Sequence, residues 1–358
     1  RPEFALTPAD TGALDHATLD LVFKQLADQH LRLGDLDAQQ LRTLVAEVVE
    51  TLVAQPGLEI LTTSLQGDYA KRRIESILVA VLTAIRQQQM ASRFATQKTE
   101  LPFGGGDRAQ QLAPIILPIG NQRQVAVRGK IDRLDTVSLN GEEYFLVIDY
   151  KSSKHVFTPL EAYYGVAMQM LTYIDAVQND LDQQGVANQP AGALYMHMHK
   201  KPVAYQPNPD KIIDAHQKAY KLQGLLVLPD DQDQALTLAE QFDAGLANAG
   251  FTSNIVQIGT KKNGEFSART QAISQAALDL YLRHNRQAII HAAQQILAGN
   301  IALAPLQFKS GATVITQRDY QAIMLFDPAA AHDRDHHVGT VDLPTIMANL
   351  RKEGEDHA

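Results

Sequence analysis

Three charged residues near the middle of the chain suit chemistry at a phosphate group. They are Asp132, Asp149 and Lys151, all within QVAVRGKIDRLDTVSLNGEEYFLVIDYKSS (124–153). Carboxylate oxygens are hard ligands that favour Mg²⁺ or Mn²⁺. A metal held in this way lowers the pKa of a bound water and stabilises charge that develops on a phosphate, while a lysine can orient that water or neutralise the transition state. The segment therefore predicts a metal-dependent hydrolytic site.

A predicted β-hairpin brings the two aspartates together. Asn140-Gly141 lies between two strand-like runs and is a strong signal for a two-residue turn. In such a hairpin, residues whose numbers sum to 281 lie opposite each other, and Asp132 and Asp149 form one of these pairs. Opposed residues project from the same face, and Lys151 joins them there two residues later. Because two opposed carboxylates repel, the pair implies a cation or a shared proton between them.

The apolar residues of the hairpin test this geometry. Phe145 and Val147 share the face of the aspartates, which indicates that this face is covered. The same count assigns five residues to the opposite, buried face: Val125, Val127, Ile131, Leu146 and Ile148. Alternatively, the hairpin lies on the surface and its aspartates and lysine form ordinary ion pairs, and a single bulge would shift the register.

Four further residues are candidates for the same site. Gln169 and Tyr173 are four apart on a predicted helix, so they share a face. They either hold Lys151 or a DNA strand, or are an ordinary core aromatic (Tyr173) and rim residue (Gln169). His16 is either a ligand that completes the metal site or a core histidine. Glu100 lies where a helical region meets the strands, and is either a further acidic ligand or a surface acid.

A basic cluster surrounds the hairpin. Its members near the acidic candidates are Arg128, Lys130, Arg133 and Lys154, and they either follow a phosphate backbone or line a solvated strand edge. The whole chain has a formal net charge of -8, which makes it a poor general binder of nucleic acid. DNA binding must therefore depend on local basic residues, on metal ions or on a partner subunit.

The elements that position these residues divide the chain by character. Helical spacing and N-cap signals predict a helical block over 17–95, which we interpret as an insertion. Later segments are predicted as strand-rich 113–151, helix 161–178, strand 191–199 and helix 268–299. We expect one α/β core over 1–327 and a mobile tail, rich in Asp and His, over 328–358.

Composition excludes several kinds of site. The chain has no cysteine, so disulfides, zinc–thiolate sites and iron–sulfur clusters are excluded. No apolar run reaches the roughly 18 residues of a membrane helix, so we expect no membrane association. There is no glycine-rich phosphate loop, and we therefore do not expect this chain to hydrolyse ATP by itself. It begins at Arg1 rather than Met, which suggests a fragment.

Four motifs in order resemble the RecB-type nucleases of the PD-(D/E)XK superfamily: GALDH (12–16), GKIDRLD (129–135), VIDYKSS (147–153) and QMLTY (169–173). Three longer segments look like the B subunit family of AddAB/RexAB helicase–nucleases: EAYYGVAMQMLTYID (161–175), AGALYMHMHKKP (191–202) and ILAGNIALAP (296–305). The resemblance implies an α/β fold, a three-layer α/β/α restriction-endonuclease-like core on a mixed sheet with helical insertions.

The resemblance also implies roles for individual residues. Asp132 and Asp149 would bind the metal, Mg²⁺ or Mn²⁺, together with His16 and the carbonyl of Tyr150. Lys151 would position the attacking water. Gln169 and Tyr173 are carried over as site residues, whereas Glu100 is not part of the strict family pattern.

One segment departs from the pattern of this family. Many of its members end this region with C-x-x-C-x-Y-x-x-I-C-x-F-D, whose cysteines ligate an iron–sulfur cluster, whereas ITQRDYQAIMLFD (315–327) has Ile315, Arg318 and Met324 at the cysteine positions. The segment resembles the branch without the cluster. Packing would then have to hold this C-terminal segment to the core.

By resemblance, the chain is a DNA exonuclease domain that degrades one strand of a broken duplex during repair of double-strand breaks by homologous recombination. Its partner would be the A subunit, AddA/RexA, and its location the cytoplasm. Two alternatives are a catalytically silent scaffold that binds DNA or the partner, and a stand-alone nuclease of the same superfamily. Loss of the opposed carboxylates would favour the scaffold, but both are present.

Overall fold

The computed structural model describes residues 8–56, 58, 61–105, 111–153, 155–198, 208–308 and 336–356. Its centre is a mixed sheet of six strands in the order β1-β4-β5-β6-β7-β8. Their bounds are β1 (Ala95–Phe103), β4 (Gly129–Leu139), β5 (Glu142–Lys151), β6 (Asn188–His197), β7 (Gln223–Val227) and β8 (Ala272–Ile273). The pairs β5–β6 and β7–β8 are parallel, and the other pairs are antiparallel.

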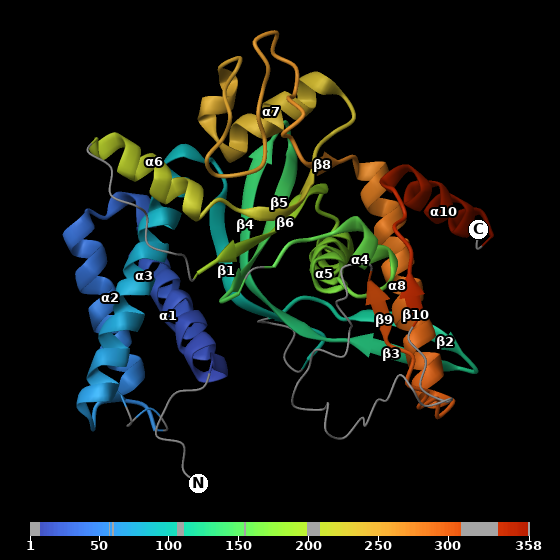
Figure 1. Ribbon diagram of the computed structural model, residues 1–358, viewed down its shortest axis with the longest axis horizontal. Coiled ribbons are helices and arrows are strands. Elements are labelled where there is room, and N and C mark those ends of the chain that lie inside the picture. Colours follow the sequence, from blue (N-terminus) through green and yellow to red (C-terminus); the bar gives the residue numbers. More distant parts are fainter. Residues whose placement is uncertain are drawn as a thin grey trace.

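Helices cover both faces of this sheet, as the predicted three-layer fold requires (Figure 1). One face packs on the N-terminal helices and on α7, and the other packs on α5 and α8. The helices are α1 (Pro8–Asp28), α2 (Ala38–Val53), α3 (Leu65–Ala91), α4 (Pro159–Tyr163), α5 (Gln169–Gln183), α6 (Pro209–Ala219), α7 (Gln232–Phe242), α8 (Gln275–Leu297) and α10 (Leu343–Asp356).

Alternation along the central strands separates the two cores. In β5, Leu146 and Ile148 point to the core of the N-terminal helices, whereas Phe145 and Val147 point to the core of α5 and α8. β5 and β6 are buried along most of their length, because helices cover them on both sides. Hydrophobic burial on two faces thus fixes the strand register from which the site is built.

The N-terminal helical block has clear start signals. The Asp37 side chain accepts hydrogen bonds from the backbone of Gln39 and Gln40 and forms a capping box at the start of α2. Ser64 caps α3. The three helices pack on one another through fully buried residues such as Val45 and Leu78. Helices predicted from the sequence are therefore present in this region, while its interpretation as an insertion stays a prediction.

The predicted hairpin has the predicted register. β4 and β5 pair from Leu139–Glu142 to Arg133–Ile148, and Asn140 and Gly141 have φ of 54° and 87°. Two consecutive positive φ values are the mark of the two-residue turn that Asn-Gly favours. The next pair in this register, beyond the hydrogen-bonded ladder, is Asp132 with Asp149.

The assignment of Ile131, Val125 and Val127 to the face of Leu146 and Ile148 was wrong. All three lie with the core of α5 and α8. β4 changes face at Asp132, which lies opposite Glu100 between the pairs Thr99–Arg133 and Leu101–Ile131. The alternation rule fails there because the partner residue, Glu100, has a left-handed φ of 47°.

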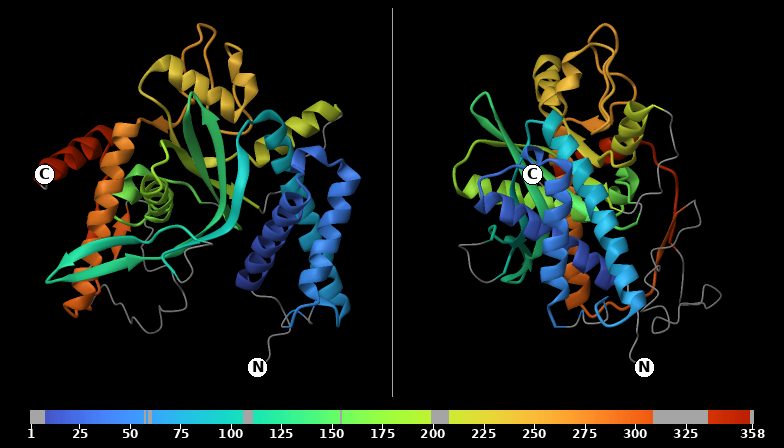
Figure 2. Two further views of the ribbon diagram at one scale, coloured as in Figure 1. Left: turned by 180° about the vertical axis from the view of Figure 1, so that it is seen from behind. Right: turned by 90° about the vertical axis from the view of Figure 1, so that its left-hand side faces the viewer.

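The valines belong to a separate hairpin of β2 (Ile115–Gly120) and β3 (Arg123–Val127). It extends below the main sheet to α8 (Figure 2), where the Gln294 side chain donates to the Ile119 carbonyl over 3.1 Å. The expected helix over 161–178 is divided into α4 and α5. The expected long helix over 268–299 spans Gln275–Leu297.

The prediction of a mobile tail over 328–358 needs a correction for α10. This helix packs on α8 through buried Ile346 and Leu350. Before it, β10 (His336–Val338) pairs in parallel with β9 (Leu306–Phe308). The spacing of apolar residues in 343–350 carries this signal, which the surrounding Asp and His residues obscured. Among the described residues, no helix is long and apolar enough to cross a membrane.

Candidate metal centre

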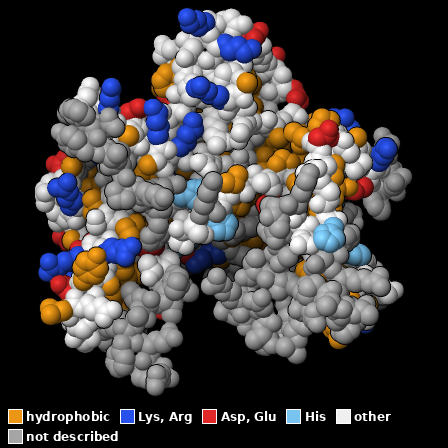
Figure 3. Space-filling model, viewed as in Figure 1, with side chains coloured by type: hydrophobic (Ala, Val, Ile, Leu, Met, Phe, Trp, Pro, Cys, Tyr) orange, Lys and Arg blue, Asp and Glu red, His pale blue; other side chains and the backbone are white. Residues whose placement is uncertain are grey.

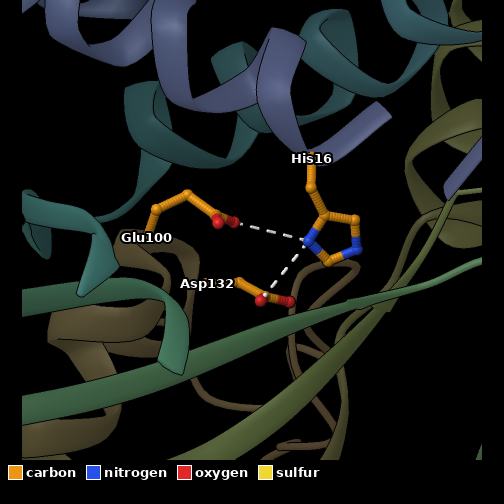
Figure 4. Close-up of side chains that lie close together, drawn as sticks. All are labelled: His16, Glu100 and Asp132. Carbon is orange, nitrogen blue, oxygen red and sulfur yellow. Dashed lines mark ion pairs between the residues drawn. The ribbon is translucent and has the colours of Figure 1, made fainter. Parts of the chain in front are cut away.

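Three potential metal ligands converge from three different elements. The Nδ1 atom of His16, in α1, lies 3.4 Å from Oδ1 of Asp132 in β4 and 3.5 Å from Oε1 of Glu100 in β1 (Figure 4). Their ligand atoms all lie within 4.8 Å of one another. One imidazole nitrogen with carboxylate oxygens is a suitable donor set for a divalent cation.

The backbone holds the carboxylates in place. One oxygen of Asp132 accepts a hydrogen bond of 2.8 Å from the Tyr150 backbone N–H, which leaves the other oxygen toward His16. Glu100 reaches His16 from the irregular, left-handed position in β1, and its second oxygen pairs with Lys130. The register between β1 and β4 therefore places the two acids side by side.

A second group of side chains surrounds Asp149. Lys151 Nζ lies 2.7 Å from its Oδ2, and the Gln169 Nε2 donates to its Oδ1 over 3.0 Å. The Gln169 amide also accepts from Lys151 over 2.9 Å and donates to the Tyr173 hydroxyl over 2.9 Å. The predicted role of Gln169 in holding Lys151 has this geometric support. One amide thus orients the acid, the lysine and the tyrosine together.

Burial and neighbouring charged groups shift the pKa values of three residues in the site. Burial and then the charge of Asp132 raise the pKa of Asp149 to about 6. Burial tends to lower the pKa of His16, but hydrogen bonds to Asp132 and Glu100 outweigh it and raise that pKa to about 10. Burial works against ionisation of Glu100 as well, yet hydrogen bonds from His16 and Lys130 hold its pKa low. A proton on His16 thus sits between acids in the position where a bound cation would neutralise them.

The donor set, with a proton held between acids, fits a divalent metal. The acids are buried, with Asp132 7% and Asp149 2% exposed, so an ordinary surface hairpin does not describe the structure. Glu100, left open between ligand and surface acid by the sequence, lies at the candidate centre. The Tyr150 backbone N–H contacts Asp132, whereas coordination by its carbonyl stays a prediction.

The proposed DNA-binding cluster is only partly on the surface. Arg128 and Lys130 are exposed. Arg133 is not a surface residue, which contradicts its predicted contact with DNA: it is 3% exposed, pairs with Asp135 and lies over the Phe23 ring at 5.3 Å. Strand alternation turns it toward α1. Lys154 and residues 315–327, which resemble the cluster-free branch, lie outside the described residues.

Sequence reasoning missed Tyr195 as a neighbour of the site. In β6 it pairs with Asp149, and its ring lies 5.7 Å from Lys151 Nζ, within cation–π range. Burial, followed by the Asp149 charge, raises the Tyr195 pKa to about 12, so it stays a neutral phenol. The alternation in AGALYMHMH was visible in the sequence, but the parallel register with β5 was not.

The comparison with known families decides the superfamily. Residues 1–308 match the family model of the PD-(D/E)XK nuclease superfamily. The chain belongs to this superfamily. The mixed sheet with helices on both faces is the PD-(D/E)XK fold.

Several curated relatives are named as the B subunit of an ATP-dependent helicase/deoxyribonuclease. The chain is 42% identical to the protein of Lacticaseibacillus casei (strain BL23) over 98% of its own length and 29% of the relative. It is 32% identical to that of Enterococcus faecalis and 30% identical to that of Bacillus velezensis, over 100% of the chain and 30% of each relative. The chain therefore spans about three tenths of the length of these proteins.

Proposed function

We propose that this PD-(D/E)XK chain is the metal-dependent DNA exonuclease domain of a helicase–nuclease B subunit. The observation that carries the proposal is the arrangement of Asp132, Asp149 and Lys151, with Gln169 bonded to both Asp149 and Lys151. The names of the relatives support the assignment to a deoxyribonuclease subunit. The reaction would be hydrolysis of phosphodiester bonds in one DNA strand.

In this proposal Asp132 and Asp149 hold the metal, Mg²⁺ or Mn²⁺, with His16, Glu100 and the Tyr150 carbonyl as further donors. The metal supplies a water of lowered pKa and a positive charge beside the phosphate. Asp132 is oriented by the Tyr150 N–H, so its free oxygen faces His16. Release of the His16 proton leaves an imidazole nitrogen that can bind the metal.

Lys151 is the cation that would contact the phosphate of the substrate. Its ammonium group is held by Asp149, Gln169 and the Tyr195 ring. At 20% side-chain exposure it has access to a phosphate that enters the site. We propose that it orients the attacking water and neutralises charge that develops on the phosphate oxygens. The Gln169 amide oxygen accepts from Lys151 and keeps it in place, while the Gln169 amide N–H donates to the Tyr173 hydroxyl.

The proposed complex includes an A subunit, AddA/RexA, that unwinds a broken duplex while this domain cuts one strand. Such a partner would contribute much of the DNA path, which suits a chain of net charge -8. On the face drawn in Figure 3, Lys and Arg side chains gather on the upper part, over α6 and α7, and acidic ones lie among them. Repair of chromosomal breaks by homologous recombination would place the complex in the cytoplasm.

The test is degradation of end-labelled single-stranded DNA with Mg²⁺, with Mn²⁺ and with EDTA. We expect cleavage that needs metal and is lost in Asp149→Asn and Lys151→Ala, while Lys352→Ala, on the far helix α10, cuts as the unmodified chain does. If the chain alone does not cut, the complete B subunit is assayed with its A subunit and ATP. Inactivity there would overturn the nuclease proposal in favour of a silent scaffold.

A further inference from the structure

A cavity of about 290 Å³ lies between α1 and β1, next to the candidate metal centre. Its apolar wall includes Phe23 and Leu31, and its polar lining includes Lys24, Arg32 and Lys98. We propose that this cavity binds the DNA single strand on one side of the cut, as a subsite for a base and its neighbouring phosphates. The inference rests on the proposed nuclease function and adds a part of the substrate path.

The cavity is continuous with the metal centre along one seam. On α1, His16 is followed at helical spacing by Asp20 and Lys24, which lie on the same side of the helix, and Leu31 lies in the connection after the helix ends at Asp28. On β1, Glu100 is preceded by Thr99, which donates a hydrogen bond of 2.6 Å to Asp20. The helix and the strand therefore run in opposite directions along each other, with the metal centre at one end of the seam and the cavity beyond Asp20.

The lining has the charge that a phosphate chain needs. It contains three cationic side chains, of which Lys24 pairs with Asp20 and Arg32 and Lys98 are left for a phosphate. Lys98 is exposed and has no ion pair among the described residues. Arg32 donates through Nη2 to the Gln89 carbonyl over 3.3 Å. Asp20, between the cavity and the metal centre, is neutralised by Lys24 at 2.7 Å and bonded by Thr99, so it is a weak obstacle to phosphate.

The apolar wall indicates the rest of the ligand. Leu31, which is 39% exposed, offers an apolar surface against which a base or sugar can pack, while cations meet the backbone. Phe23 lies behind it, buried, with the Arg133 guanidinium over its ring. This combination suits a single strand better than a lone anion, because a lone anion gains nothing from an apolar wall. Such contacts do not discriminate among bases, since every base has an apolar face.

The test measures binding rather than cleavage. A fluorescein-labelled oligothymidylate of about 12 nucleotides, within the usual site size of single-strand binders, is titrated with the chain in Ca²⁺ buffer at several salt concentrations. The strand is checked on a gel for intactness. The variants are Lys98→Ala and Lys98→Glu, and the matched control is Lys352→Ala on α10, a similarly exposed lysine on the other side of the sheet.

For each phosphate that a variant no longer binds, the slope of log affinity against log salt should fall by about 0.7 for a single strand. We expect this change in Lys98→Ala, a larger one in Lys98→Glu, and none in Lys352→Ala. Lys98 variants that bind like the control would overturn the proposal. Displacement of the strand by inorganic phosphate at constant ionic strength would also overturn it, in favour of a lone-anion site.

The measurement is independent of whether the chain cuts DNA. Altered salt dependence in the Lys98 variants, with no cleavage by any variant, would support the strand site and contradict the proposed nuclease. Normal salt dependence with metal-dependent cleavage would do the reverse. Lys98 is exposed, so thermal melting of its variants should match the unmodified chain and exclude misfolding as the cause.

Discussion

The two halves of the candidate site are built in different ways. The His16 half draws its side chains from α1, β1 and β4, which are more than 30 residues apart along the chain. The Lys151 half draws on the end of β5 and the first turns of α5, which follow each other closely. The first half gathers acids around a proton on His16, and the second ties one cation to one acid through Gln169. In the proposed function, the first half supplies most of the metal donors and the second holds the cation for the substrate, with Asp149 shared between them.

The largest expected effect is in the Lys151 half of the site. Lys151→Ala removes the cation that faces the phosphate, and cleavage should fall on the order of 10³-fold, as for the loss of one preorganised donor in other active sites. Metal affinity, measured by isothermal titration calorimetry with Mn²⁺, should not weaken. Loss of metal binding in this variant would show that the two halves are not separable.

Gln169→Leu tests the link inside the same half. Without the amide, Lys151 and Tyr173 lose a common partner, and the oxygen of Asp149 that Gln169 contacts loses its donor. We expect cleavage to fall about 10–100-fold, the usual cost of losing an orienting partner. The rate at saturating DNA should account for most of the loss. An effect confined to the KM for DNA would instead make Gln169 a strand contact.

The His16 half is tested by the pH dependence of metal affinity. His16 has a pKa raised to about 10, so below that pH the metal must displace its proton. Between about pH 6.5 and 8.5, affinity for Mn²⁺ should rise roughly tenfold per pH unit, because one proton is released. His16→Gln has no proton to displace, and its affinity should vary little over this range. Parallel pH profiles for both proteins would exclude His16 from the metal centre.

The same shift predicts how the metal-free protein responds to pH. A His pKa raised from 6.5 to about 10 stabilises the folded state fully below pH 6.5, and this contribution is lost as pH rises through about 10. Denaturant unfolding in EDTA at pH 6.5 and pH 9.5 should therefore show a fall in stability that is smaller in His16→Gln. Added Mn²⁺ should reverse the fall, because the cation takes the place of the proton.

The smallest effect is expected at Tyr195. Tyr195→Leu removes the ring beside Lys151, and cleavage should fall about three- to tenfold. Tyr195→Phe keeps the ring and should cut nearly as well as the unmodified chain. Equal losses in both variants would assign the effect to the hydroxyl.

The sequence predicted those features that depend on local pattern. Asn140-Gly141 set the hairpin register, and the four-residue spacing of Gln169 and Tyr173 set a shared helix face. It failed where the outcome depended on long-range packing. Alternation could not show that β4 changes face at Asp132, because the cause is the left-handed Glu100 in a strand 30 residues away.

Arg133 is a second case in which long-range packing decided a residue's position. Its neighbours Arg128 and Lys130 are exposed. Alternation puts Arg133 on the other face of β4 from Lys130, but the sequence does not show what covers that face. Its burial follows from α1, which places Phe23 against the guanidinium while Asp135 neutralises it. A charged residue in a predicted strand can be assigned to the surface only when the other side of that strand is known to be open.

The position of His16 on α1 has a consequence for assembly. The sheet can bring Asp132, Asp149 and Lys151 together by its own hairpin, but the imidazole arrives only when the N-terminal helices dock, with Phe23 over Arg133. A chain that has formed its sheet and not yet docked those helices has an incomplete set of donors for the metal. In the proposed nuclease, full metal binding therefore depends on docking of the N-terminal helices. A newly made chain would cut DNA efficiently only after this docking has added the His16 donor.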